Sequence, residues 1–219
     1  EHTLENHIYW INKVLKELEL KELVYAGQDW GGPIGMGALS LSPELLKGAV
    51  LLNTGFNAPR VNADLSPAHA LVKTPVIGEL LLEVIFSIFE RLKSVQGNPD
   101  SWTLEVAELY GRPVYESGNS KAPLAMMRMV PDGPNHPSTP SMRRVEEYVN
   151  TLEIPAEIVW GENDPILGRG LPIMQQNFPN ARLSKTTAGH FLQEEVPNEI
   201  AEALIRVIGE ITDSQTQKN

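Results

Sequence analysis

Several residue types are absent or scarce in this chain of 219 residues. It contains no cysteine, which excludes disulfide bonds, cysteine metal sites and a thiol nucleophile. Positive charge is the scarcer sign, because 18 Lys and Arg stand against 28 Asp and Glu, and the formal net charge is −10. Nucleic acids and anionic membranes attract clustered Lys and Arg, so we expect neither as a partner. We interpret the excess of acidic residues as favouring solubility.

Long apolar runs are also missing. Stretches such as "LLLEVI" at residues 80–85 are far too short to cross a bilayer. With 42% hydrophobic and 21% charged residues, the composition is that of a globular protein with one sizeable core, or a core with a lid. The lack of cysteine fits a reducing compartment, so we expect a cytoplasmic protein. The sequence begins at Glu1, and any targeting segment would lie upstream.

The first quarter of the sequence alternates between helix and strand patterns. Apolar residues recur at helical spacing over residues 4–18, and "KELVYAG" then predicts a strand that ends at Gly27. A helix over residues 34–41 and an apolar strand at 48–53 follow. A nearly all-apolar strand is typical of a parallel sheet covered on both faces, and strand–helix–strand implies a right-handed crossover. The pattern therefore predicts an α/β fold with a mostly parallel sheet.

The middle of the sequence has no strand of comparable quality. Between residues 58 and about 145 it carries helical patches at 77–92 and 102–110, and the stretch "VPDGPNHPSTP" at 130–140, which we interpret as a turn-rich connector. We predict that this region is a helical cap inserted into an α/β core. The predicted boundaries are residues 1–57 for the first part of the core, 58–147 for the cap, and 148–219 for the second part of the core.

The strand pattern resumes after the predicted cap. The expected strands lie at 156–161 and 181–186, and the expected helices at 172–178 and 199–211. About four strands are visible in all, and the first would be an exposed edge, which proteins normally cover. Together with the missing initial methionine, this pattern predicts that the sequence is the C-terminal part of a longer domain.

The stretch "GQDWG" at residues 27–31 has the form of a nucleophile elbow. In such an elbow a strand turns sharply into a helix and lifts one side chain out of the sheet, and small residues are needed two before and two after it. Asp29 occupies the position where serine is usual. The alternative interpretation is that Asp29 only caps the following helix, as Asp commonly does.

Two further residues complete the pattern of a catalytic triad. Asp164 follows the strand at 156–161 and His190 follows the strand at 181–186, in the order nucleophile, acid, histidine. Taken alone, Asp164 could be an Asx turn before Pro165, and His190 an ordinary loop histidine. We interpret the remaining histidines as surface or packing residues: His2, His7, His69 and His136.

The choice of carboxylate points to a particular chemistry. Asp29 can attack a saturated carbon that bears a leaving group, forming an alkyl ester without prior activation by a base. His190 can then deprotonate a water that attacks the ester carbonyl, while Asp164 orients the imidazole. The backbone N–H of Trp30 would hold the oxyanion, and its indole N–H suits a weakly hydrated halide. Core packing is the alternative role for the Trp30 ring.

The motifs "GQDWGG", "WGENDPILG" and "AGHFLQEEVP", with "RMVP" at residues 128–131, resemble those of haloalkane dehalogenases of the α/β-hydrolase fold. The resemblance implies a hydrolase that converts small hydrophobic halogenated substrates into an alcohol and a halide ion, without cofactor or metal. It implies that the family's further oxyanion donor and a halide-binding asparagine would lie upstream of this sequence. The implied site residues are Asp29 as nucleophile, Trp30 for the halide, Asp164 as acid and His190 as base.

The cap departs from the family pattern. Where some members place a halide-binding tryptophan, the segment "FSIFERL" puts Phe89, which we assign to substrate binding, with Trp102 as a substitute donor. We expect apolar cap residues to form the substrate wall: Phe86, Phe89, Leu124, Met126 and Met127. Asn53, after the neighbouring strand, stands where some members have the acid and cannot serve as one.

Two alternatives remain from the sequence. Epoxide hydrolases share the aspartate and histidine, but they need cap tyrosines to protonate the opened ring, and Tyr110 and Tyr115 do not match that family's placement. A non-catalytic relative that uses the fold as a binding module is the other alternative, because a fold does not determine a function.

Overall fold

The computed structural model describes residues 1–62, 67–80, 88–118 and 121–216. Its sheet has four parallel strands in the order β1-β2-β3-β4, so β1 and β4 are the edges. The predicted strands are confirmed, and β2 starts two residues earlier than expected because Leu46 pairs with Leu23 before a register shift. The bounds are β1 (Leu23–Gly27), β2 (Leu46–Leu51), β3 (Ala156–Gly161) and β4 (Arg182–Thr186).

Alternate residues of the two central strands bury into two separate hydrophobic clusters. Leu51 and Ile158 point into a cluster on one face of the sheet, whereas Val50 and Val159 point into a cluster on the other. All four are fully buried. Successive side chains of a strand face opposite sides, so these apolar runs require helices on both faces.

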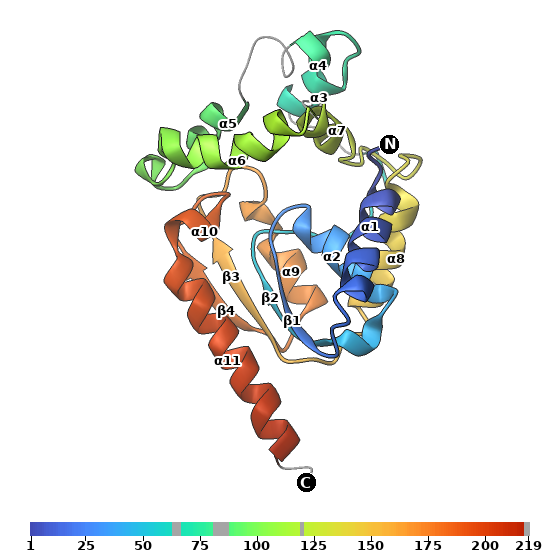
Figure 1. Cartoon of the computed structure of the whole chain (residues 1–219), viewed down its shortest axis with the longest axis vertical. Helices are drawn as coiled ribbons and strands as arrows, with labels where there is room; N and C mark the ends of the chain where they lie inside the picture. Colours follow the sequence, from blue (N-terminus) through green and yellow to red (C-terminus); the bar gives the residue numbers. More distant parts are fainter. Residues whose placement is uncertain (63–66, 81–87, 119–120, 217–219) are drawn as a thin grey trace.

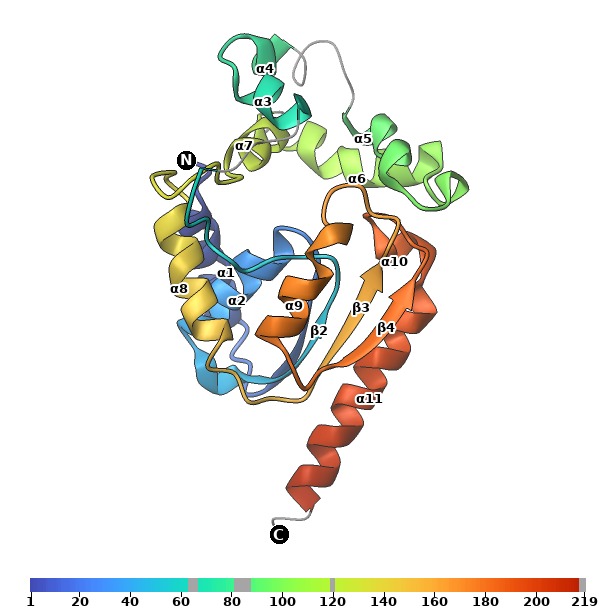
Figure 2. The same cartoon turned by 180° about the vertical axis from the view of Figure 1, so that it is seen from behind.

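Helices cover both faces, as Figures 1 and 2 show from opposite sides. The larger cluster is covered by α1 (Leu4–Glu17), α2 (Gly31–Ser40), α8 (Thr139–Val149) and α9 (Leu171–Asn177). The smaller cluster is covered by α10 (Leu192–Glu195) and α11 (Pro197–Thr216). Short 3₁₀ turns link the elements: η1 (Pro43–Leu45), η3 (Leu92–Val95), η4 (Pro99–Ser101) and η5 (Gly168–Gly170).

Helix α1 illustrates how the sequence sets these elements. The Thr3 side chain accepts the N–H of Asn6 at 3.1 Å and caps the helix, and Leu4 and Ile8 bury its apolar face. The buried Asn12 amide donates to Ala38 O and Ser42 Oγ, both at 3.0 Å, and so joins α1 to the end of α2. The helix predicted at residues 4–18 is confirmed within one residue.

The remaining helices lie together beyond the carboxyl ends of the strands (Figure 1). They are α3 (Pro67–Lys73), α4 (Ile77–Glu79), α5 (Ile88–Arg91), α6 (Leu104–Glu116) and α7 (Ala122–Arg128). The described residues between 58 and 145 contain no strand, in agreement with the predicted helical region. The helix predicted at 77–92 is represented by α4 and α5, and Phe86 lies outside the described residues. Arg128 joins α7 to α4 through a bidentate ion pair with Glu79, at 2.7 and 3.0 Å.

Helix α8 packs against α2 and belongs to the core layer, with Met142, Val145 and Val149 in the larger cluster. The cap boundary at residue 147 stays a prediction. Across the described ranges, none of the helices combines the length and the apolar character that crossing a membrane would require.

Candidate active site

Asp29 lies at the tip of the turn between β1 and α2. Its φ of +47° falls in the left-handed region that side-chain-bearing residues rarely adopt. Three hydrogen bonds hold this conformation: the Asp29 N–H donates to Asn53 O at 2.8 Å, and the Asp29 carbonyl accepts Thr54 Oγ1 at 2.7 Å and Gly32 N at 3.1 Å. The elbow predicted from "GQDWG" is therefore present.

The crowding at the elbow differs from the expectation. A Cβ at Gly27 would lie 2.6 Å from the Tyr25 ring, as predicted for the small residue before Asp29. At Gly31 the nearest described atom would be 3.8 Å away, so the expected crowding there is wrong for the described residues. The close approach is at Gly32, where a Cβ would lie 1.9 Å from Thr54 Oγ1. Thr54, three residues after the end of β2, supports the elbow, and a side chain at Gly32 would displace it.

The structure brings Asp29, Asp164 and His190 together at the carboxyl ends of β1, β3 and β4. His190 Nδ1 lies 3.0 Å from Asp164 Oδ2, and His190 Nε2 lies 4.0 Å from Asp29 Oδ2. The side chains of His190 and Asp164 are buried, whereas 40% of the Asp29 side chain is exposed. The arrangement leaves part of the Asp29 side chain accessible and places an imidazole nitrogen near its carboxylate.

Asp164 uses both carboxylate oxygens. Oδ1 accepts the N–H groups of Ile166 at 2.7 Å and Leu167 at 3.1 Å, which is the Asx turn considered as the alternative role. Oδ2 faces His190, so the same side chain forms the Asx turn and contacts the imidazole that it is predicted to orient. Burial raises the pKa of Asp164, but the hydrogen bond and charge of His190 and the donors Ile166 N–H and Asn53 outweigh it. The pKa of Asp164 is therefore below its usual value, and Asp164 is a carboxylate.

Asn53 holds Asp164 in place, a role that sequence reasoning missed. The Asn53 amide is fully buried; its Nδ2 donates to Asp164 Oδ2 at 2.8 Å and to Gly161 O at 2.9 Å, and its Oδ1 accepts Gly161 N at 2.8 Å. The side chain thus joins the end of β2 to the end of β3. The sequence did carry a signal for this contact: Asn53 follows β2 and Asp164 follows β3. The carboxyl ends of two adjacent parallel strands lie side by side, which places the two residues close together.

Gln28 contacts the imidazole from the other side. Its Nε2 donates to His190 O at 2.9 Å and lies 3.3 Å from His190 Nε2. Because the amide nitrogen has no lone pair to offer, the contact requires Nε2 to be the acceptor. The hydrogen of His190 is then on Nδ1, toward Asp164, and Nε2 carries the lone pair, which accepts from the Gln28 amide here. This is the tautomer that a general base needs.

The electrostatic surroundings of Asp29 oppose its ionisation. Burial raises the pKa of Asp29; the charge of His190 and a hydrogen bond from the Trp30 backbone N–H lower it in part, and the pKa stays above its usual value. His69 of α3 also lowers the pKa of Asp29, so this half-buried cap residue lies within electrostatic range of the site. The sequence reading of His69 as a surface or packing residue did not anticipate that proximity.

The aromatic candidates lie in different places. The Trp30 indole packs, partly buried, against the larger hydrophobic cluster beside Asp29. The Phe89 ring lies 5.9 Å from that of Tyr115, centre to centre, and against Gly111 of α6. Trp102 Nε1 donates to Phe89 O at 2.8 Å, so the expected substitute donor is engaged within the cap. The described contacts of Phe89 are thus with the cap.

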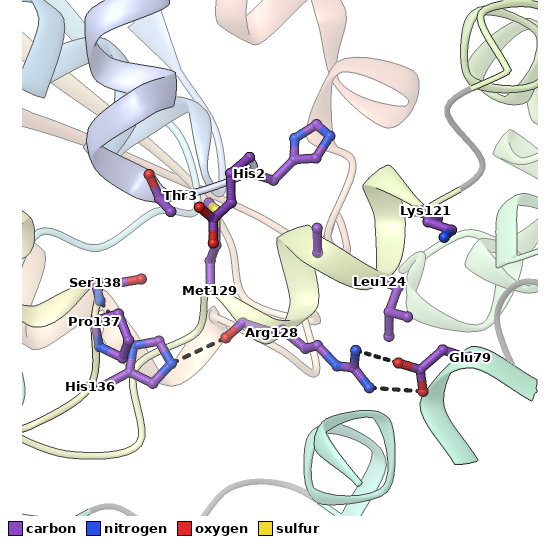
Figure 3. A pocket seen from close by; sticks show the side chains of 12 residues that line it. His2, Thr3, Glu79, Lys121, Leu124, Arg128, Met129, His136, Pro137 and Ser138 are labelled. Atoms are coloured by element: carbon purple, nitrogen blue, oxygen red, sulfur yellow. Dashed lines mark hydrogen bonds and ion pairs between the residues drawn. The ribbon is translucent and has the colours of Figure 1, made fainter. Parts of the chain in front are cut away.

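A cavity of about 380 Å³ lies between α7 and the start of α1 (Figure 3). Its lining includes Thr3, Leu124, Met129 and His136, and His136 Nε2 lies 3.1 Å from Arg128 O. Asp29, Asp164 and His190 are not among its lining residues. Within the described part of the chain, no group of three or more His, Asp or Glu is placed to hold a metal ion.

The fold and the triad geometry define a class. Residues 1–197 match the family model of the alpha/beta hydrolase fold, and the chain belongs to this family. It is a hydrolase that resembles the haloalkane dehalogenases in sequence and in fold.

Individual relatives extend the comparison. The chain is 26% identical over 228 residues to a cis-3-alkyl-4-alkyloxetan-2-one decarboxylase of Shewanella oneidensis, covering 100% of this chain and 70% of the relative. It is 26% identical over 216 residues to a haloalkane dehalogenase of Psychrobacter cryohalolentis, covering 95% and 67%. The crystal structure of haloalkane dehalogenase DbeA from Bradyrhizobium elkani superposes with a TM-score of 0.83 at 17% identity, covering 97% and 75%. The chain therefore spans about two thirds to three quarters of the length of these relatives.

Proposed function

We propose that this hydrolase cleaves the carbon–halogen bond of small apolar haloalkanes through an alkyl ester on Asp29. The observation that carries the proposal is a partly exposed carboxylate on a left-handed elbow, 4.0 Å from His190 Nε2, whose Nδ1 faces Asp164. A serine esterase would need a hydroxyl at this position. The haloalkane dehalogenases among the relatives support the choice of substrate class.

In the first step an Asp29 oxygen attacks the carbon that bears the halogen. The carbon–oxygen bond forms as the carbon–halogen bond breaks, and the halide leaves with the bonding electrons. The Trp30 indole N–H is the proposed donor to the halide, because it sits next to Asp29 on a partly buried ring. Phe89 is proposed to contribute apolar surface only. The ionised form of Asp29 needs no base for this attack.

In the second step water hydrolyses the ester. His190 Nε2 takes a proton from a water molecule, which attacks the ester carbonyl of Asp29. The gap of 4.0 Å between Nε2 and Asp29 is longer than a direct hydrogen bond and suits a bridging water. The Trp30 backbone N–H stabilises the oxyanion, and Asp164 stabilises the imidazolium. Haloalkane and water thus give alcohol, halide and a proton.

A second candidate is decarboxylation of a β-lactone, supported by the relative from S. oneidensis, which aligns with the whole chain. Asp29 would attack the saturated ring carbon that bears the ring oxygen; the bond between that carbon and oxygen breaks and releases a tethered carboxylate. Loss of carbon dioxide would then form an alkene as the bond between Asp29 and carbon breaks. This sequence consumes no water, so it does not use His190 as a base.

Epoxide hydrolysis has less support. It needs a phenol that can donate its proton to an opening epoxide, and Tyr110 donates its hydroxyl to Glu194 at 2.7 Å. Burial and this hydrogen bond raise the pKa of Tyr110 to about 12, which makes it a weaker acid. Tyr115 is 54% exposed and packs its ring against Phe89.

The deciding assay incubates the purified protein in parallel with 1,2-dibromoethane, styrene oxide and a cis-3,4-dialkyl-oxetan-2-one. The expected result is bromide release with the first compound, lost in Asp29→Asn. His190→Ala should release about one equivalent of bromide and keep the alkyl group, visible as a mass increment on the peptide that contains Asp29. Alkene or diol without bromide would overturn the haloalkane proposal in favour of the corresponding candidate. No product from any of the three would favour a non-catalytic relative.

A further inference from the structure

The carboxylate of Glu195 joins the cap to the loop that carries His190. Its Oε1 accepts the N–H groups of Gly189 at 2.8 Å and Gly97 at 3.0 Å, and its Oε2 accepts the N–H of Asn98 at 2.7 Å. Gly189 immediately precedes His190, whereas Gly97 and Asn98 belong to the cap segment between η3 and η4. One side chain thus binds three backbone donors from two segments that are far apart in the sequence.

The neighbouring residues continue the same contact. The His190 N–H donates to Val95 O at 2.9 Å, and the Phe191 N–H donates to Gln96 Oε1 at 2.9 Å. Three consecutive N–H groups of the loop, at residues 189–191, therefore end on Glu195 or on the cap segment 95–98. We call this set of contacts the histidine latch.

The backbones in the histidine latch touch directly. A Cβ added at Gly97 would lie 2.2 Å from Thr187 O, and one at Gly189 would lie 2.3 Å from Val95 O. At these two glycines the loop and the cap segment are in backbone contact, so a shift of one segment would move the other. The position of the His190 backbone is therefore tied to the cap as well as to β4.

We propose that Glu195 is a positioning residue for the ester-hydrolysis step: through the histidine latch it holds His190 where Nε2 can activate water. The inference rests on the proposed function. It concerns the second step alone, because Asp29 is held by Asn53 O and Thr54 Oγ1, which the latch does not include. A carboxylate is required because its two oxygens accept three N–H groups, whereas an amide would turn an N–H₂ group toward at least one of these donors.

The test compares Glu195→Gln with Glu194→Gln. Both residues lie on α10, both bridge to the cap, and both substitutions remove one negative charge. Glu194 accepts the Tyr110 hydroxyl at 2.7 Å, a bond that a glutamine oxygen retains, and it does not contact the loop N–H groups. The first-turnover burst and the steady-state rate of bromide release from 1,2-dibromoethane are measured for each variant, together with amide hydrogen exchange.

In Glu195→Gln we expect the burst rate to stay within about threefold of wild type and the steady-state rate to fall at least about tenfold. The ester should accumulate on Asp29, because partial loss of general-base catalysis slows only its hydrolysis. Glu194→Gln should behave as wild type. Equal loss of both steps in Glu195→Gln, or no loss, would overturn the inference.

Hydrogen exchange separates failure of the latch from failure of the proposed reaction. Exchange at residues 95–98 and 189–191 should accelerate in Glu195→Gln, with the peptide that contains Asp29 unchanged. This comparison needs no substrate, so it tests the latch even where wild type releases no bromide. Unchanged exchange at both segments would contradict the latch itself.

Discussion

The folded protein holds Asp29 in an unfavourable backbone conformation and in surroundings that disfavour its ionised form. Its left-handed backbone places Cβ close to the following carbonyl, which costs on the order of 1 kcal/mol. Burial also raises the pKa of its carboxyl, so the ionised form is less stable in the folded protein than in water. Such unfavourable terms persist where the surrounding structure holds them, here through Asn53 O and Thr54 Oγ1. The arrangement costs stability at the residue that we propose as the nucleophile.

We predict that Asp29→Asn abolishes turnover and raises the thermal unfolding midpoint. A carboxyl whose pKa is raised by folding destabilises the fold at neutral pH, and an uncharged amide removes that term. Asn also tolerates the left-handed region. Calorimetry at neutral pH measures the change. A lower midpoint than wild type would contradict the proposed electrostatic origin.

We predict that Asn53→Ala lowers the free energy of unfolding by about 1–3 kcal/mol, because it removes hydrogen bonds from buried polar groups of Gly161 and Asp164. The matched control is Asn163→Ala, since the Asn163 amide donates to Thr187 O from an exposed position. Urea denaturation of both variants measures the difference. An equal loss of unfolding free energy in both variants would show that the buried hydrogen bonds of Asn53 stabilise the fold no more than the exposed one of Asn163.

At the scale of elements, the unit that presents the proposed nucleophile Asp29 is β1, the turn and α2, supported by the segment after β2. Tyr25 of β1 donates its hydroxyl to Gly31 O, and its ring lies across Gly27 and Gly35. Thr54, after β2, supports the turn from the other side and crowds Gly32. The elbow is therefore set by contacts between elements as well as by its own sequence.

Gly32→Ala and Gly31→Ala form a matched pair one residue apart at the start of α2. We expect Gly32→Ala to destabilise the protein by about 1–3 kcal/mol, because its Cβ would overlap Thr54 Oγ1. Gly31→Ala has space and should be neutral or stabilising by up to about 1 kcal/mol, since Ala is the better helix former. Thermal denaturation checks both. The reverse order would mean that the crowding lies elsewhere in the elbow.

At the scale of the whole molecule, the parallel sheet gathers residues that are far apart in the sequence. Asp29, Asn53, Asp164 and His190 follow four strands whose carboxyl ends share one edge of the sheet, with the cap helices beyond them (Figure 1). The contacts of Glu195 with segment 95–98 and of Glu194 with Tyr110 then join the cap to the core. The position of the cap and that of the site are thus linked.

The opposite pKa shifts of Asp29 and Asp164 predict two pH effects. The burst of bromide release should fall as the pH is lowered, with a midpoint above pH 3.8, because the raised pKa makes Asp29 take up a proton at a higher pH than an exposed aspartate does.

The lowered pKa of Asp164 stabilises the fold. This contribution is fully present above the pKa of about 3.9 that the group has in the unfolded chain, and it is lost as the pH falls through the lower pKa of the folded state. Unfolding midpoints of wild type and Asp164→Asn across acidic to neutral pH measure the second effect. Their difference should be constant near neutrality and shrink in acid; growth in acid would contradict the sign.

The amino-acid sequence by itself determined the order of elements and singled out the three residues of the proposed triad. The apolar runs at β2 and β3, the helical spacing of α1 and the placement of Asp164 and His190 after strands follow from local patterns, because strand and helix periodicities are properties of short segments. The same reasoning found Asp29 from the glycines and the strand around it.

Only the tertiary structure decided which other side chains complete the site. Gln28 on His190, Asn53 between Asp164 and Gly161, and Glu195 on the loop at 189–191 depend on contacts between segments that are remote in the sequence. Likewise, the space at Gly31 and the crowding at Gly32 depend on Thr54, which no local pattern places against the elbow. Local periodicity fixes the element in which a residue lies, but the packing of elements fixes the residue it meets.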